Sequence, residues 1–155
     1  MSVGCTLVPV EIEEREEFLA MAEQHFHELN PAFTPAHDWQ SSYFETIKGN
    51  PNYLLRWILV DGQRAGFIIS GVEKHHFLPR KTGAIYELYV VPGQRKRGIA
   101  RACAAQVIKE LRKLSISKIQ LEVVEGNVAA LELWRSLGFR KVTERLVLME
   151  GYGAK

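Results

Sequence analysis

The chain has 155 residues, 46% of them hydrophobic and 25% charged, and a formal net charge of +2. This is the composition of a soluble globular domain, and the length is enough to bury a core without metal or disulfide staples. Cys5 and Cys103 fit no metal or disulfide spacing, which favours a reducing compartment. No basic and apolar leader opens the sequence, and no apolar run approaches the length of a membrane span. We therefore expect one domain over residues 1–155, in the cytoplasm and without a membrane partner.

The first half of the chain predicts a strand, a long helix and a hairpin. Residues 6–10 are short and apolar, as in a strand, and residues 11–29 carry apolar side chains on one helical face up to the breaker Asn30-Pro31. Residues 32–50 read as irregular or weakly helical. The apolar segments YLLRWILV and RAGFIISGV flank Asp61-Gly62-Gln63, which is a strong hairpin signal.

The second half alternates strands and helices. A loop with His75 and His76 leads to the strand AIYELYVV, and a glycine loop then opens a helix from about Gly98 to Leu114. KIQLEVVE is the next strand, Asn127 caps a second helix that ends near Gly138, and FRKVTERLVLME closes as a final strand. The strand–helix–strand crossover should be parallel and right-handed. This order predicts a mixed sheet with helices on both faces.

Charge is distributed unevenly along the chain. Residues 1–50 hold two basic residues against nine acidic ones, a net of −7, whereas residues 80–113 hold nine basic against two acidic, a net of +7. The basic block suggests an anionic ligand, although a solvated helix face has the same composition. Nucleic acid is a weaker candidate, because aromatic residues do not alternate with the basic ones as a stacking platform requires. We expect no nucleic-acid partner.

The segment GQRKRGIA, residues 93–100, has the glycine spacing of a phosphate-binding loop without its catalytic parts. In ATP- and GTP-binding loops the second glycine is followed by Lys and then Ser or Thr, whereas Gly98 is followed by Ile99 and Ala100. The loop lies between a strand end and a helix start, where backbone N–H groups converge and the helix dipole adds positive charge. Gly98 lets a phosphate approach the backbone. The loop is suited to a pyrophosphate that is held but not cleaved, as in coenzyme A.

Two motifs in this part of the chain resemble those of the GCN5-related N-acetyltransferase (GNAT) family. The family pattern Arg/Gln-x-x-Gly-x-Gly/Ala after a strand ending in Val reads Arg95-Lys96-Arg97-Gly98-Ile99-Ala100 after Val90. The pattern Asn-x-x-Ala-x-x-Leu-Tyr-x-x-x-Gly-Phe is matched, with Trp in place of Tyr, by Asn127, Ala130, Leu133, Trp134, Gly138 and Phe139. The resemblance covers nearly the whole chain. It implies an α/β (α+β) fold with a mixed, centrally splayed sheet of six to seven strands and about four helices.

By this resemblance the co-substrate is acetyl-CoA and no metal is required. Backbone amides would bind its pyrophosphate, contributed by Arg95, Lys96, Arg97, Gly98, Ile99, Ala100 and Arg101. The pantetheine arm would be held like an added strand by Leu88, Val90 and Val91, with a further contact from Asn127. The acetyl thioester would lie between AIYELYVV and KIQLEVVE, where a backbone N–H near Val90 would polarise its carbonyl.

The implied reaction is direct attack of a neutral amine on the acetyl carbonyl. An amine in water is mostly ammonium, so a base or a desolvating site must remove a proton. Glu87 is the leading candidate for the base, because it lies three residues before Val90 and many family members have an acid in this stretch. Alternatively, Glu87 binds the ammonium without taking its proton, or pairs with an arginine. His75 and His76 are more distant alternatives.

The group that protonates the leaving thiolate is less clearly marked. The family commonly has Tyr where this chain has Trp134, and an indole does not supply a proton near neutral pH. Tyr89 or Tyr86 would then act as the acid, or the proton of the attacking amine would pass to sulfur through water. Trp134 would lie either beside the sulfur or in the core. Cys103, on an apolar helix face, is expected to be a packed thiol.

We therefore expect an N-acetyltransferase that acts on a primary amine of a small molecule or peptide. Two alternatives stay open: a catalytically weak acyl-CoA-binding regulatory module, favoured by the missing Tyr, and a protein-directed acetyltransferase. The acceptor pocket should be formed by residues 32–50 and 73–82. As a hypothesis, the acidic first 50 residues draw a cationic amine toward the cleft. The resemblance is compatible with a homodimer.

Overall fold

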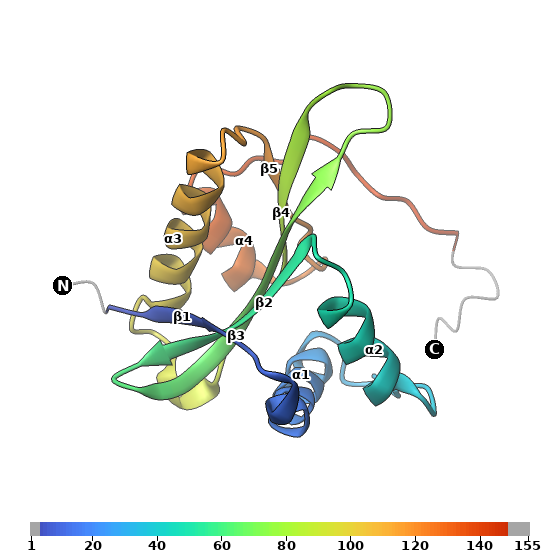
Figure 1. The fold of residues 1–155 in the computed structure, drawn as a ribbon, viewed down its shortest axis with the longest axis vertical. Coiled ribbons are helices and arrows are strands. Elements are labelled where there is room, and N and C mark those ends of the chain that lie inside the picture. Colours follow the sequence, from blue (N-terminus) through green and yellow to red (C-terminus); the bar gives the residue numbers. More distant parts are fainter. Residues whose placement is uncertain (1–3, 149–155) are drawn as a thin grey trace.

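The computed structural model describes residues 4–148 and contains one sheet with helices on both of its faces (Figure 1). The element order is β1 (Thr6–Pro9), the 3-10 turn η1 (Ile12–Glu14), α1 (Arg15–Leu29), α2 (Trp39–Lys48), β2 (Tyr53–Val60), β3 (Gln63–Lys74), β4 (Lys81–Val90), the 3-10 turn η2 (Pro92–Gln94), α3 (Ile99–Lys113), β5 (Ile119–Gln120) and α4 (Val128–Ser136). No helix in the described part of the chain is both long and apolar enough to cross a bilayer.

The sheet has the order β1-β2-β3-β4-β5, and its first four strands are antiparallel. β5 runs parallel to β4, as the predicted crossover through α3 requires. One core lies between the sheet and α3 with α4, around Ile68, Val107 and Trp134. A second core lies on the opposite face under α1 and α2, around Phe18 and Phe67. The predicted mixed sheet with helices on both faces is confirmed.

Local sequence signals set the predicted turns and caps. Asp61 and Gly62 both have positive φ, at 52° and 76°, which is the backbone of a type I′ hairpin turn. Asn127 caps α4 by accepting a hydrogen bond from the N–H of Ala130 at 3.2 Å, and Gly138 follows the same helix with φ 99°. These three predictions are confirmed, because each depends on residues that are close together in the chain.

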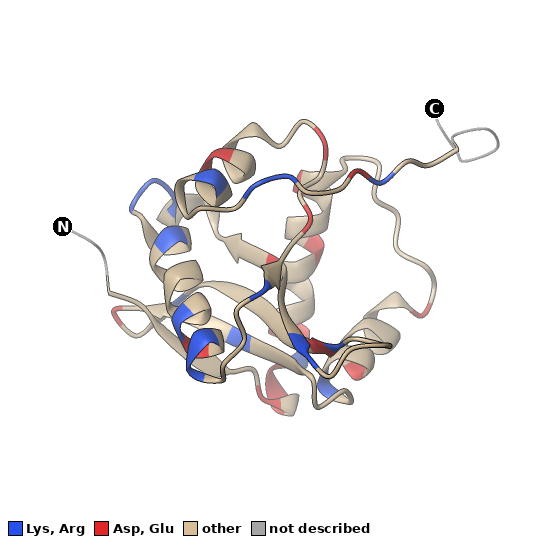
Figure 2. Ribbon diagram, turned by 90° about the horizontal axis from the view of Figure 1, so that it is seen from above, with Lys and Arg blue, Asp and Glu red and all other residues tan. Residues whose placement is uncertain are grey.

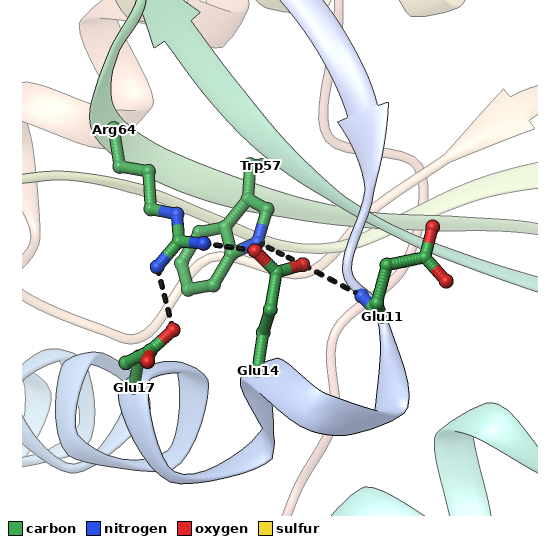
Figure 3. A network of polar contacts seen from close by, with 5 residues as sticks. All are labelled: Glu11, Glu14, Glu17, Trp57 and Arg64. Carbon is green, nitrogen blue, oxygen red and sulfur yellow. Dashed lines mark hydrogen bonds and ion pairs between the residues drawn. The ribbon is translucent and has the colours of Figure 1, made fainter.

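The acidic start of the first helix is fixed to the β2–β3 hairpin (Figure 3). The carboxylate of Glu14 accepts hydrogen bonds from the N–H of Glu11 at 2.8 Å and from the indole of Trp57 at 3.1 Å, and it pairs with Arg64. Arg64 also bonds Glu17 at 2.7 Å. The hydrogen bond from Glu11, followed by those from Trp57 and Arg64, lowers the pKa of Glu14. Part of the acidic run therefore has a structural role.

Two of the predicted strands differ from the structure. KIQLEVVE forms only the two-residue β5, and residues 140–148 contain no strand, so the described residues give a five-stranded sheet instead of six or seven strands. Residues 149 and 150 of the predicted last strand lie outside the described residues. A strand needs a neighbour for its backbone groups, and β5 leaves β4 after Gln120. The apolar alternation of the last segment therefore has no sheet to pack on, and Val142 and Leu146 are 84% and 88% exposed.

Candidate active site

A β-bulge in β4 directs Glu87 toward α1. Ile69 of β3 pairs with Glu87 and Ser70 pairs with Ile85, so Tyr86 is an extra residue in β4. Ile85 and Leu88 belong to the core under α3, and Glu87 therefore faces the opposite side, under α1 and α2. Strict alternation from Ile85 would have placed Glu87 on the α3 side. The bulge thus decides which face of the sheet carries the carboxylate.

On the α1 side, Glu87 meets a histidine. Nε2 of His25 lies 3.4 Å from Oε2 of Glu87, and the two side chains are 10% and 20% exposed. Tyr43 of α2 is near the same carboxylate: burial, with a smaller contribution from the charge of Glu87, raises the pKa of the Tyr43 hydroxyl well above its usual range. Glu87 is therefore a partly buried acid at the meeting point of β4, α1 and α2.

The carboxyl-terminal half of β4 has an open edge. Gly83 donates its N–H to Lys118 at 2.8 Å, and the pairing with β5 ends at Ala84 and Gln120. At the other end of β4, the N–H of Val91 bonds the carbonyl of Ala65 in β3 at 2.8 Å. Because backbone groups alternate between the two sides of a strand, those of Leu88 and Val90 point to the side that β5 has left. The sheet is thus splayed, as the resemblance implied.

Beyond the open edge, the chain passes through η2 into the start of α3. Gly98, with φ 80°, is the residue before the helix, and its carbonyl accepts the N–H of Ala102 at 3.0 Å. The N–H groups of Ile99, Ala100 and Arg101 precede this first helical bond, and no side chain among residues 4–148 caps them. A Cβ placed on Gly98 would meet no atom within 4 Å. Free donors beside open space fit a pyrophosphate group.

Basic residues surround this helix start. Lys and Arg recur along α3 in Figure 2, and Lys96 is held in a left-handed conformation with φ 62°. Arg97 bonds Gln94 within the loop, and Arg101 bonds Ser136 at the end of α4. The N–H of Arg95, by contrast, is donated to Pro92 at 3.3 Å, so its amide is already used inside η2. The backbone N–H groups of residues 96–101 have no hydrogen-bond acceptor among the described residues.

Tyr89 faces α1, two residues beyond Glu87. Its hydroxyl donates to Glu28 at 3.2 Å, and the guanidinium of Arg95 lies 5.4 Å from the centre of its ring. Burial, and then the charge of Glu28, raise the pKa of Tyr89. The hydroxyl therefore stays protonated at neutral pH, which is a requirement for a proton donor.

The α4 residues approach the site from the other face of the sheet. Trp134 is 7% exposed, packs against Phe139 with ring centroids 5.5 Å apart, and shares a core cluster with Val90 and Ile99. Asn127 uses its side-chain oxygen to cap α4. Cys103 is fully buried in the same cluster, and burial raises its pKa to about 12, which confirms the expected packed thiol.

The structure separates the loop histidines from Glu87. His75 uses Nδ1 to accept the N–H groups of Phe77 and Leu78, both at 3.1 Å, in the loop that precedes β4, at the opposite end of the strand from Glu87. Tyr86 donates its hydroxyl to Glu73 at 2.7 Å. Residues 4–148 contain no cluster of three or more His, Cys, Asp or Glu side chains suited to a metal ion.

Sequence reasoning missed His25 and Tyr43 as neighbours of Glu87. A usable signal exists for His25, which follows Phe18 by seven residues and Ala22 by three and so falls on the buried face of α1. Tyr43 precedes the buried Phe44 in a segment that reads as only weakly helical. Its proximity to Glu87 depends on how α2 packs against the sheet.

The fold is shared with solved acetyltransferase structures. The ribosomal-protein-alanine N-acetyltransferase from Brucella melitensis superposes with a TM-score of 0.73 at 19% identity, covering 96% of this chain and 99% of that one. A predicted acetyltransferase from Clostridium acetobutylicum, solved with acetyl-CoA, gives a TM-score of 0.73 at 15% identity, covering 98% and 100%. These similarities define the class of fold as that of the acetyltransferases.

Sequence comparison identifies the family of the chain. The model of the acetyltransferase (GNAT) family matches residues 15–139. The [Ribosomal protein bS18]-alanine N-acetyltransferase of Escherichia coli is 32% identical over 110 residues, which are 71% of this chain and 70% of the relative. The chain belongs to the acetyltransferase (GNAT) family and is an N-acetyltransferase.

Proposed function

We propose that the protein transfers the acetyl group of acetyl-CoA to a primary amine by direct attack, with both substrates bound together. One observation carries this proposal: the bulge at Tyr86 places the partly buried carboxylate of Glu87 beside an open strand edge, which continues directly into the uncapped start of α3. A site for a proton acceptor, an edge for an extended chain and a site for an anion thus follow one another within residues 87–101.

The residues suited to hold the coenzyme lie in two groups. The free N–H groups of residues 96–101 and the charge of the surrounding Lys and Arg side chains suit the pyrophosphate. The backbone of Leu88 and the N–H of Val90 suit the pantetheine arm, whereas Val91 donates its N–H to Ala65 at 2.8 Å and accepts the N–H of Gln94 at 2.9 Å, so its backbone is already used. Asn127 has a side-chain NH₂ left for the same arm after its oxygen has capped α4. When bound, acetyl-CoA supplies the activated acetyl group.

In this proposal Glu87 takes the proton from the acceptor ammonium. The freed amine nitrogen forms a bond to the acetyl carbon while the bond from that carbon to sulfur breaks. The sulfur leaves with a proton from Tyr89, and the second proton, lost by the acetylated nitrogen, restores the Tyr89 hydroxyl. The N–H of Val90 at the open edge stabilises negative charge on the carbonyl oxygen. Tyr89 is the proposed source of the thiol proton, because its hydroxyl keeps its proton at neutral pH. Trp134 forms the packed floor beneath this end of β4.

The acceptor side is walled by aromatic rings. Trp39 stacks on Tyr43 with centroids 5.5 Å apart, and Phe26 contacts Phe33 and Trp39 at 5.5 and 6.2 Å. Such a wall binds ammonium groups and the apolar groups next to them. A relative with 32% identity is named for acetylating an alanine of a ribosomal protein. A peptide with an amino-terminal alanine is therefore the first acceptor to test.

A second candidate is an acyl-CoA-binding module with little turnover, which is favoured by Trp134 in the place of the family's Tyr. A free-thiol assay with acetyl-CoA separates the two. The panel contains an alanyl hexapeptide, the same peptide with an acetylated amino terminus, sisomicin, spermidine and free alanine. Thiol release that depends on a free amine supports the enzyme. Acetyl-CoA binding by calorimetry without thiol release from any amine supports the module, and absence of binding rejects both.

A further inference from the structure

His25 lies on the buried face of α1, in direct contact with the acid of the site. The residue is only 8% exposed, although α1 has exposed positions on both sides of it. Its ring is enclosed by three aromatic rings, those of Phe26, Phe67 and Tyr89, with centroids at 5.2, 5.8 and 5.2 Å. These contacts come from α1, β3 and β4, so the plane of the imidazole is fixed by the core under α1 and α2.

The enclosed ring has one side-chain hydrogen-bond partner in the described part of the chain. Nε2 of His25 faces Oε2 of Glu87 at 3.4 Å, at the long end of the hydrogen-bond range. Catalytic hydrogen bonds of this length often shorten when substrates are bound. Oε1 of Glu87 accepts no hydrogen bond from residues 4–148. The two oxygens of the carboxylate thus have different surroundings.

A partly buried carboxylate is expensive to desolvate unless a donor satisfies it. A neutral imidazole with its proton on Nε2 supplies such a donor without adding a positive charge to a site that must accept an ammonium. It also stops rotation of the carboxylate, because the donor holds one oxygen in place. The free oxygen is then left for the acceptor amine. An apolar side chain at position 25 would fill the same space and provide neither effect.

We propose that His25 is a positioning residue, whose Nε2–H holds Oε2 of Glu87 so that Oε1 receives the proton of the acceptor amine. This inference rests on the proposed function, since it assigns a helper to the proposed base. It also explains why a polar side chain lies on the buried face of α1, whose other buried residues are Phe18, Leu19 and Ala22. Loss of the donor should lower kcat and leave the binding of acetyl-CoA intact.

The test compares His25→Phe, which keeps a ring, with His25→Gln, which keeps a donor at a similar reach. Each is measured alone and in a Glu87→Gln background, with the best amine of the panel above. We expect His25→Phe to lower kcat about 10- to 100-fold, the loss typical of a misplaced catalytic group, with KM for acetyl-CoA unchanged. We expect His25→Gln to recover most of the lost rate, and His25→Phe to have no further effect once Glu87 is replaced.

A spectroscopic readout that does not depend on turnover completes the test. Two-bond ¹H–¹⁵N spectra of histidine-labelled protein should show the Nε2–H tautomer for His25, and this signal should change in Glu87→Gln. Thermal unfolding of each variant identifies losses that come from misfolding. Wild-type kcat in His25→Phe, or equal losses with and without Glu87, would overturn the positioning role alone. Wild-type kcat in Glu87→Gln would overturn the base assignment and this inference with it.

Discussion

Arg95 donates a hydrogen bond from Nε to the carbonyl oxygen of Val90 at 2.7 Å, so the side chain of the loop reaches back to the end of β4. Its Nη2 bonds both oxygens of Glu28 in α1, at 2.7 and 2.9 Å. One guanidinium therefore connects the strand end, the loop and the first helix. It holds the loop amides in place before any ligand arrives.

Arg95→Lys tests this connection. A lysine keeps the charge but lacks the planar donor set, so it cannot make the three contacts at once. Losing one or two charge-assisted hydrogen bonds should raise KM for acetyl-CoA about tenfold. The control is Arg97→Lys in the same loop, whose guanidinium bonds only Gln94 among the described residues. Equal effects of both substitutions would show that the tie to β4 and α1 is unimportant.

Gly98→Ala should weaken acetyl-CoA binding. A Cβ on Gly98 meets nothing in the protein, but its φ of 80° costs an alanine about 1–2 kcal/mol, so the loop will shift. Gly62→Ala in the hairpin turn is the matched control, since its φ is 76° and its Cβ is equally free. Both variants should lose similar stability in thermal unfolding. Only Gly98→Ala should lose affinity in calorimetry, and a shared loss would contradict a ligand site at Gly98.

The ion pair between Arg56 of β2 and Glu110 of α3 predicts a pH-dependent stability. Two hydrogen bonds of 3.1 and 2.8 Å join them, and the bond from Arg56 is the main cause of the lowered pKa of Glu110. A carboxyl whose pKa is lower in the folded state stabilises the fold above its unfolded pKa, near 4.5, and loses this contribution as the pH falls through the folded pKa.

Glu110→Gln should therefore lower the free energy of unfolding at pH 7, and the difference from wild type should shrink below pH 4.5. We expect a loss of about 1–2 kcal/mol at pH 7, because Arg56 is 12% exposed and its charge would lose its partner. The loss is no larger because Glu110 is 40% exposed, so that solvent screens its charge. Urea unfolding at several pH values measures the difference. A constant difference from pH 7 to pH 3 would exclude this ion pair as its source.

Tyr89→Phe tests the proposed acid. Because burial and Glu28 raise the pKa of Tyr89, the hydroxyl stays protonated below pH 10, and kcat of the wild type should not fall on the alkaline side until above that pH. The variant should lose about tenfold or more in kcat, as expected for removal of a general acid. Unchanged kcat would assign the thiol proton to another source, such as the attacking amine.

Much of the fold follows from local sequence, and the site follows only in part. The turn at Asp61-Gly62 and the cap at Asn127 are set by neighbours in the chain, so they could be predicted. The contact between His25 and Glu87 joins residues 62 positions apart, and depends on how α1 packs against β4.

The periodicity of a sequence does not predict those features of a strand that depend on its pairing with a neighbouring strand. The bulge at Tyr86 arises from the register between β3 and β4, which no single segment contains. Likewise, residues 140–148 have the alternation of a strand, but β5 offers them too short a partner in the described residues. A pattern states which face a strand would present, and a neighbouring strand determines whether it forms.

The extra residue in β4 shows that the face reached by Glu87 depends on how many residues of the strand are paired with β3. Removal of Tyr86 would place Glu87 directly after Ile85, and regular alternation would then keep the carboxylate on the α1 side, opposite Ile69. A deletion of Tyr86 should therefore keep most of the acetyltransferase activity, whereas Glu87→Gln should lose it. Regular pairing of every residue in β4 would instead send the acid to the α3 side, so the bulge compensates for one extra residue in the strand.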